Sequence, residues 1–392
     1  MFEPTFTQEL SKMNAVENIQ YLTQKYFGIE FKVTQKQESF SNNCTGALIR
    51  NDDFHEFKAN FISLLLRLSG YYKTQQARQE IANKLKELAI SNKYGWAGYY
   101  SELIALDVYA ISSAISNIDY INIFKRIDGT LAQRMSQKKI DIDLSFILNN
   151  KKYYTDIKAF KSLNTELYDD ITQTAMELVK KELKQQTIIA VDNLEPITDE
   201  DTSLLGNNKK EIIDCILNAV RKRATTINYT ATNNLNIKFK ISYGHVLTTI
   251  TTKNPVDMAD VDYKKIYKYA NKLLARQPSL LTFIANPWFN KEFINTNSDF
   301  FKIYFKKVAT NIFANKSQAH ISDKSNITFK EFTENLSGLI FIVDNSIKSS
   351  KCLYDLYIYF NPNATNADSR VCFSDFETAF KNQRFINLIY IQ

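Results

Sequence analysis

Hydrophobic positions near the start of the chain recur at three- and four-residue intervals. In the segment 52–90 the repeated apolar residues are Phe54, Phe57, Phe61, Leu64, Leu65 and Leu68. This spacing places the side chains along one side of a helix, where they are buried together. We therefore predict helices over 7–27 and 52–90, and another over 99–115, after the glycines of "KYGWAG" interrupt the preceding one.

The hydrophobic period changes in the stretch "KKIDIDLSFILNNKKYYTDIKAFK", residues 138–161. Two runs rich in β-branched and aromatic residues flank the turn-forming "NNKK", which predicts a β-hairpin. A helix over 164–186 and a short buried strand over 187–192 are expected next. The predicted order from 99 to 192 is helix, strand, strand, helix, strand.

The acidic and polar segment "NLEPITDEDTSLLGNNKK" follows and contains a proline and a glycine, which is typical of a domain boundary or a long surface loop. Beyond it we predict helices at about 209–224, 261–275 and 298–313. We predict a pair of strands within 226–253 and single strands at 279–289, 336–344 and 353–363. The fold class is therefore α/β. We expect the N-terminal helices and a first α/β domain over 1–195, and a second α/β domain over 209–392 that recognises a target or a partner.

Composition and charge narrow the functional classes. Hydrophobic residues make up 44% and charged residues 23% of the 392 residues, as in a globular protein. The net charge of +7 suits a polyanionic partner such as nucleic acid. No apolar run approaches the roughly 18 residues of a membrane span, and "MFEPTFTQEL" does not resemble a signal peptide, so we expect a soluble, cytoplasmic protein. A zinc site or disulfide framework is not expected, because the cysteines are far apart in the sequence: Cys44, Cys215, Cys352 and Cys372.

Charged residues interrupt the predicted hairpin where a sheet core needs apolar side chains: Asp141, Asp143, Asp156 and Lys158. Residues two apart on a strand share a face, and antiparallel pairing brings Asp143 and Asp156 onto adjacent strands. Two close, buried carboxylates are costly unless a cation binds between them. Mg²⁺ prefers such oxygen ligands and retains waters for chemistry, while Lys158 beside it orients a water or stabilises charge on a phosphate.

At this point the stretch 99–192 resembles the PD-(D/E)xK nuclease superfamily, which has the restriction-endonuclease-like fold. The residues that carry the resemblance are Glu102 in "YYSELIALDVY", Asp143 in "IDIDLSFIL", and Asp156 with Lys158 in "YYTDIKAF". The resemblance implies a mixed sheet flanked by helices, with Glu102, Asp143 and Asp156 holding Mg²⁺ or Mn²⁺. It further implies an endonuclease that hydrolyses DNA phosphodiester bonds in restriction, antiphage defence or DNA repair.

Several alternatives stay open. Asp141 is an alternative ligand to Asp143, and Ile142 stands where many members of the superfamily have proline. Gln173 is followed four residues later by Glu177, where some members have tyrosine. The charged residues also fit an exposed hairpin face with a cross-strand ion pair. In function, the alternatives are a catalytically silent nucleic-acid-binding or sensor subunit of a defence complex, and a nuclease that cleaves RNA. A protein partner, a homo-oligomer and the sequence specificity are equally open.

Overall fold

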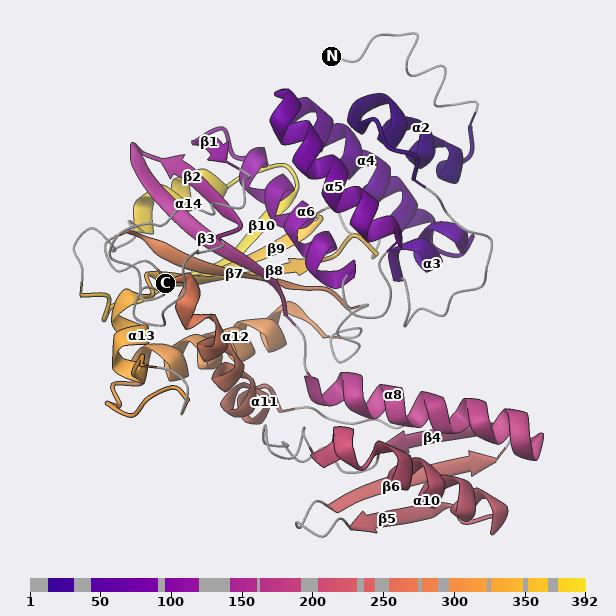
Figure 1. The fold of residues 1–392 in the computed structure, drawn as a ribbon. Coiled ribbons are helices and arrows are strands. Elements are labelled where there is room, and N and C mark those ends of the chain that lie inside the picture. Colours follow the sequence, from indigo (N-terminus) through magenta and orange to yellow (C-terminus); the bar gives the residue numbers. More distant parts are fainter. Residues whose placement is uncertain are drawn as a thin grey trace.

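The computed structural model describes thirteen stretches of the chain (Figure 1). They are residues 13–31, 44–90, 96–119, 142–160, 163–191, 204–230, 236–243, 254–273, 277–287, 296–322, 326–347, 352–365 and 373–392.

A large mixed sheet forms the centre of the molecule. Within the described stretches it has seven strands in the order β1-β2-β3-β7-β8-β9-β10. Strands β1, β2 and β3 form an antiparallel meander, β3, β7 and β8 run parallel, and β9 is antiparallel to β8 and parallel to β10. The α/β prediction is thus confirmed. The strand bounds are β1 Ile115–Asp119, β2 Leu144–Leu148, β3 Lys151–Ala159, β7 Ser279–Ala285, β8 Gly338–Asp344, β9 Tyr354–Phe360 and β10 Ile386–Ile391.

Helices cover both faces of this sheet (Figure 1). On the first face lie the N-terminal helices and α14: α2 Ala15–Phe27, α3 Cys44–Arg50, α4 His55–Tyr71, α5 Gln75–Ile90, α6 Trp96–Ile111 and α14 Phe373–Phe380. The second face packs against α11 Pro255–Asp262, the 3₁₀ helix η2 Tyr263–Lys272, α12 Ser298–Ala314 and α13 Phe329–Asn335.

The helix predicted over 52–90 is two helices, α4 and α5. The first ends at Tyr72, whose ψ of 88° is not helical. Thr74 begins the second, because its hydroxyl accepts a hydrogen bond from the backbone N–H of Ala77 at 3.2 Å. A threonine at this position accepts a hydrogen bond from a backbone N–H group of the first helical turn, which has no partner within the helix.

Side-chain alternation in β3 divides its residues between the two faces. Thr155 faces helix α6, since its hydroxyl lies 2.8 Å from that of Thr282, which lies 2.7 Å from the hydroxyl of Tyr109 in α6. Phe160 faces the other way and packs edge-on against Phe283. Because successive side chains on a strand point to opposite faces, Asp156 and Lys158 belong to the second face, that of η2.

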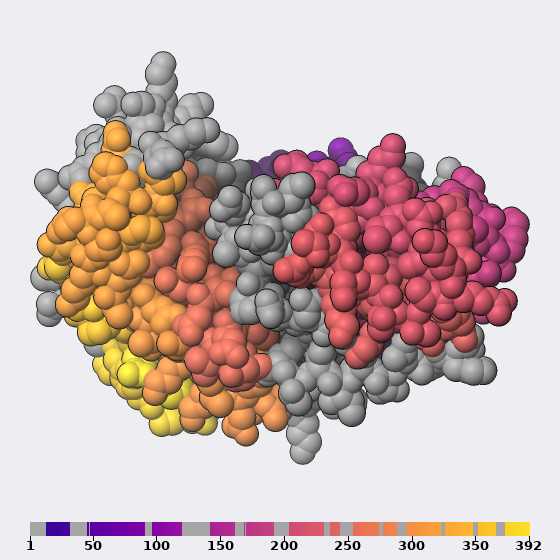
Figure 2. Space-filling model, turned by 90° about the horizontal axis from the view of Figure 1, so that it is seen from below, coloured from indigo at the N-terminus to yellow at the C-terminus, as the bar shows by residue number. Residues whose placement is uncertain are grey.

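A smaller lobe follows β3 and lies to one side of the main body (Figures 1 and 2). It has its own three-stranded antiparallel sheet in the order β4-β6-β5, and its own core, which includes Ile189, Ile216 and Phe239. Its elements are α8 Leu163–Leu178, the π-helix η1 Val179–Leu183, β4 Thr187–Val191, α10 Lys209–Arg221, β5 Thr226–Thr230 and β6 Asn236–Tyr243.

The strand that lies beside β3 differs from the one expected. The predicted strand 187–192 is β4, which belongs to the small lobe, whereas β3 pairs in parallel with β7. The burial patterns explain this difference: every residue of β7 is buried, as a central strand requires, while β4 is buried fully at Ile189 alone. The main sheet therefore takes strands from both sides of the boundary expected at 195–209, and that boundary falls inside the small lobe.

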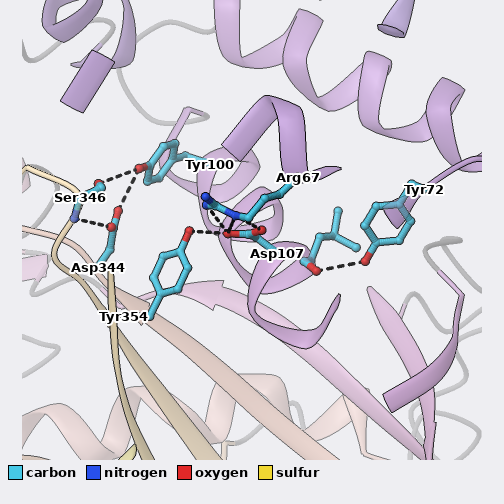
Figure 3. Close-up of polar contacts among 8 residues, drawn as sticks. Arg67, Tyr72, Tyr100, Asp107, Asp344, Ser346 and Tyr354 are labelled. Carbon is cyan, nitrogen blue, oxygen red and sulfur yellow. Dashed lines mark hydrogen bonds and ion pairs between the residues drawn. The ribbon is translucent and has the colours of Figure 1, made fainter. Parts of the chain in front are cut away.

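Buried polar contacts join the helices of the first face to the sheet (Figure 3). Arg67 of α4 binds both carboxylate oxygens of Asp107 in α6, at 2.7 Å at the closest, and the hydroxyl of Tyr354 in β9 donates to Asp107 at 2.8 Å. Nearby, Asp344 at the end of β8 accepts a hydrogen bond from the Tyr100 hydroxyl at 2.9 Å. These contacts tie α4 and α6 to β8 and β9.

Candidate functional site

Three of the residues singled out in the hairpin come together in the structure. The ammonium nitrogen of Lys158 lies 2.8 Å from Oδ2 of Asp156 and 3.1 Å from Oδ2 of Asp143. The two carboxylate oxygens are therefore no further apart than the sum of these distances. Both aspartates belong to the same cluster, as a shared cation site requires.

The hairpin geometry produces this convergence. Leu144 pairs with Thr155 in the antiparallel register, so Asp143 enters strand β2 level with Asp156 on strand β3. The backbone N–H of Ile157 donates to Oδ2 of Asp143 at 2.7 Å, which fixes that carboxylate against β3. The turn itself is made by asparagines with positive φ, and the lysines predicted for it are the first residues of β3.

Burial shapes the electrostatics of the cluster. The side chain of Asp156 is fully buried, while that of Lys158 is 25% exposed. Burial, and next the negative charge of Asp143, raise the pKa of Asp156 to about 8, against the opposing effect of the lysines. Burial lowers the pKa of Lys158, but the two aspartates outweigh it, so that the pKa of this ammonium is raised and the lysine stays charged.

The oxygens of Asp156 suit a hard cation. The oxygens of this buried carboxylate face ammonium groups, Lys158 at 2.8 Å from Oδ2 and Lys272 at 3.7 Å from Oδ1, and accept no further hydrogen bond within the described stretches. Mg²⁺ binds through one or two carboxylates and fills its remaining positions with water and substrate phosphate. In the part of the chain that the structure describes, no group of three or more His, Cys, Asp or Glu side chains could hold a metal ion, so Asp143 and Asp156 form a pair of carboxylates without a third such ligand.

Glu102 lies elsewhere. It is on helix α6, which covers the first face of the sheet, and its carboxylate pairs with Lys84 of α5 at 2.8 Å. The structure thus directs Glu102 toward a neighbouring helix and not toward Asp156. Asp141, the alternative ligand, lies outside the described residues.

Helix η2 contributes two residues that the sequence did not single out. The ammonium nitrogen of Lys272 lies 3.7 Å from Oδ1 of Asp156, and the ring centre of Tyr269 lies 5.7 Å from the Lys158 nitrogen. In the sequence they belong to "YKKIYKYANK", a lysine-rich amphipathic stretch without a recognisable motif. Their role follows only from the folding of η2 against β3.

The remaining candidates have local contacts. Lys152 pairs with Asp119 of β1 at 3.8 Å, and the Gln173 amide donates to Glu177 on α8, in the small lobe. None of these contacts involves Asp143, Asp156 or Lys158.

The described helices include none with the length and apolar character needed to cross a membrane. Comparisons with protein-family models, with curated proteins and with solved structures found no significant match to this chain.

Proposed function

We propose that the protein is a Mg²⁺-dependent endonuclease that hydrolyses DNA phosphodiester bonds. The observation that carries the proposal is the convergence of Asp143 and Asp156 on the ammonium group of Lys158. Two carboxylates that share one lysine provide both a cation site and a positive group next to it. This combination serves hydrolysis of a phosphate ester better than it serves a hairpin surface, because the Asp156 side chain is fully buried.

Each residue has a role in this proposal. Asp143 and Asp156 bind the divalent cation, which supplies Lewis-acid stabilisation of charge on the phosphate when it is bound. Lys158 orients the attacking water or stabilises negative charge on the phosphate oxygens, as its raised pKa keeps it protonated. The Ile157 backbone N–H holds the Asp143 carboxylate in place beside Lys158.

Part of the element order supports the proposal, because helix α6 precedes the hairpin β2–β3, which carries Asp and then Asp-x-Lys. The strand expected after the next helix, β4, belongs to the small lobe, and the strand beside β3 is β7. The net charge of +7 suits a nucleic-acid substrate. We infer from the resemblance a cytoplasmic role in restriction or antiphage defence.

A cleavage assay tests the proposal. Purified wild type is incubated with plasmid DNA and with Mg²⁺ or Mn²⁺, beside Lys158→Ala and Asp156→Asn. Lys152→Ala is the matched control, because it removes a lysine of the same strand whose ammonium group pairs with Asp119 at 3.8 Å and lies 5.4 Å from the Tyr154 ring. We expect cleavage by wild type and control, and loss of at least about 100-fold in the two site variants. Equal cleavage by all four folded proteins contradicts the proposal.

A second candidate function is a catalytically silent nucleic-acid-binding or sensor subunit. It is favoured by the fact that Lys158 and Lys272 already compensate both carboxylates without a cation. In that case no metal produces cleavage, and DNA affinity is the same in wild type and in Asp156→Asn. An RNA substrate in the same assay separates the DNA nuclease from an RNA nuclease.

A further inference from the structure

Two lysines from distant parts of the chain reach the same buried carboxylate. Lys158 on β3 lies at Oδ2 of Asp156, and Lys272 on η2 lies at its other oxygen, Oδ1. The side chain of Lys272 is 17% exposed. The side chain of Lys158 is 25% exposed, so both lysines are partly accessible to solvent beside the buried carboxylate.

The geometry of η2 gives Lys272 this position. Side chains three residues apart eclipse each other in a 3₁₀ helix, so Tyr263, Ile266, Tyr269 and Lys272 form one row. Ile266 anchors the row in the core of the second face, and Tyr269 packs near Lys158. Runs of 3₁₀ helix longer than three or four residues are uncommon, and η2 has ten. This straight row places Lys272 at Asp156.

The distances distinguish the two lysines. Lys158 lies within hydrogen-bonding distance of both aspartates, while the 3.7 Å from Lys272 to Asp156 is longer than a hydrogen bond. The cluster holds two carboxylates and two ammonium groups, and a divalent cation would add two positive charges. The site then favours an anion, and the ammonium group of Lys272 beside Asp156 is placed to contact it.

We propose that Lys272 is a phosphate-binding residue of the substrate site, which holds a backbone phosphate of the nucleic acid next to Asp156 and Lys158. This inference rests on the proposed nuclease function and extends it, because it assigns a substrate contact to a helix outside the hairpin. A lysine acts in such contacts as a point charge without strict geometry.

DNA binding as a function of salt tests the inference without catalysis. Anisotropy of a fluorescent DNA duplex is measured with Ca²⁺ in place of Mg²⁺, from 50 to 200 mM salt, for wild type, Lys272→Ala, Lys272→Arg and Lys268→Ala. Lys268 is the matched control, because it lies on the same helix but in another row, with its nitrogen 5.0 Å from the Tyr269 ring. Circular dichroism and the melting temperature verify that each variant is folded.

A lost phosphate contact reduces the slope of log affinity against log salt by about one. We expect this reduction, with roughly tenfold weaker binding at low salt, for Lys272→Ala and neither effect for Lys268→Ala. Lys272→Arg keeps the positive charge, so we expect it to retain the wild-type slope. If Lys272 had only a structural role, the charge at this position would not determine the slope.

The outcomes separate this inference from the proposed function. If Lys272→Ala keeps the wild-type slope while Lys158→Ala loses cleavage, the inference is wrong and the nuclease proposal stands. If folded wild type does not bind DNA at 50 mM salt, both are wrong. A slope reduced equally by Lys272→Ala and Lys268→Ala also overturns the inference. Such a result would mean that the DNA responds to the total positive charge of η2 and not to a specific contact of Lys272.

Discussion

Lys158 and Asp156, two residues apart on strand β3, form an ion pair of 2.8 Å between a partly exposed lysine and a fully buried carboxylate. Both side chains lie on the face of the sheet that helix η2 covers. The pair places a charge in the interior at a position where a stable sheet core would have an apolar residue. The pH dependence of unfolding measures this cost.

Asp156→Asn is expected to stabilise the protein at high pH and to have little effect at low pH. The pKa of Asp156 is raised to about 8 in the folded state, above its value in the unfolded chain. Stability from the protonated form is therefore fully present below pH ~4 and is lost as pH rises toward 8. Asparagine does not titrate, so the gain over wild type should grow across this window to on the order of 2 kcal/mol.

Urea unfolding at pH 5, 7 and 8.5, without divalent cations, measures this difference. Asp119→Asn removes an exposed carboxylate of the same sheet and controls for the loss of charge. A difference between Asp156→Asn and wild type that shrinks as pH rises would contradict the prediction.

Divalent cations should stabilise the protein through Asp156 and not through Glu102. A ligand that binds only the folded state raises its stability by about 2.7 kcal/mol at a concentration 100 times the dissociation constant. We expect Mg²⁺ to raise the melting temperature of wild type, and EDTA to reverse the rise. Asp156→Asn should abolish this response.

Glu102→Gln should keep the full response to Mg²⁺, because Glu102 pairs with Lys84 on the opposite face of the sheet. Differential scanning fluorimetry with and without Mg²⁺ measures both variants. If Glu102→Gln loses the response as Asp156→Asn does, Glu102 is a ligand, and the arrangement of α6 changes when the cation binds.

Arg67→Met should destabilise the protein by about 3 to 5 kcal/mol, because it leaves the buried carboxylate of Asp107 without its cation. Arg384→Ala is the matched control. Arg67 and Arg384 both lie over the ring of Phe385, at 4.7 Å and 5.1 Å, but Arg384 is exposed. Denaturant unfolding should show a change below about 1 kcal/mol for Arg384→Ala. Similar losses for both variants would mean that the ring contact, and not the ion pair, stabilises the helices.

Gly338→Ala should also destabilise the protein, by about 1 to 3 kcal/mol. A Cβ atom at this position in β8 would lie 2.9 Å from the backbone oxygen of Tyr359, which the paired strand cannot easily move. Gly70→Ala, in helix α4, has no neighbour within 4 Å and should instead stabilise by up to about 1 kcal/mol. Thermal unfolding of both variants gives the sign of each change, and a loss for Gly70→Ala with none for Gly338→Ala would contradict the packing of β8.

The candidate site shows which features the sequence alone predicts. Asp143, Asp156 and Lys158 lie on one hairpin, so local periodicity and a short turn were enough to bring them together. Lys272 could not be predicted, because its place depends on the packing of η2 against a strand more than one hundred positions earlier in the chain. Glu102 was assigned from the resemblance, but the rotation of α6 about its axis, which decides where a side chain points, is set by the core around Tyr100 and Asp107.

Prediction of the main sheet from the sequence had the same limits. The largely apolar run of β7 correctly predicted a buried strand, and the hairpin was predicted with its turn. The partner of β3 was not predicted, because a short apolar run such as β4 carries no information on which sheet it joins. A two-part chain was expected from the acidic segment after Val191, whereas tertiary pairing joins the strands from both sides of it.

The parallel pairing of β3 with β7 has a consequence for synthesis of the protein. During translation the hairpin emerges first, and β7 and η2 emerge only after the whole small lobe. Until then one edge of β3 has no neighbour in the sheet, and η2 does not yet cover Asp156 and Lys158. A ribosome must therefore make most of the polypeptide before Tyr269 and Lys272 can pack against the hairpin.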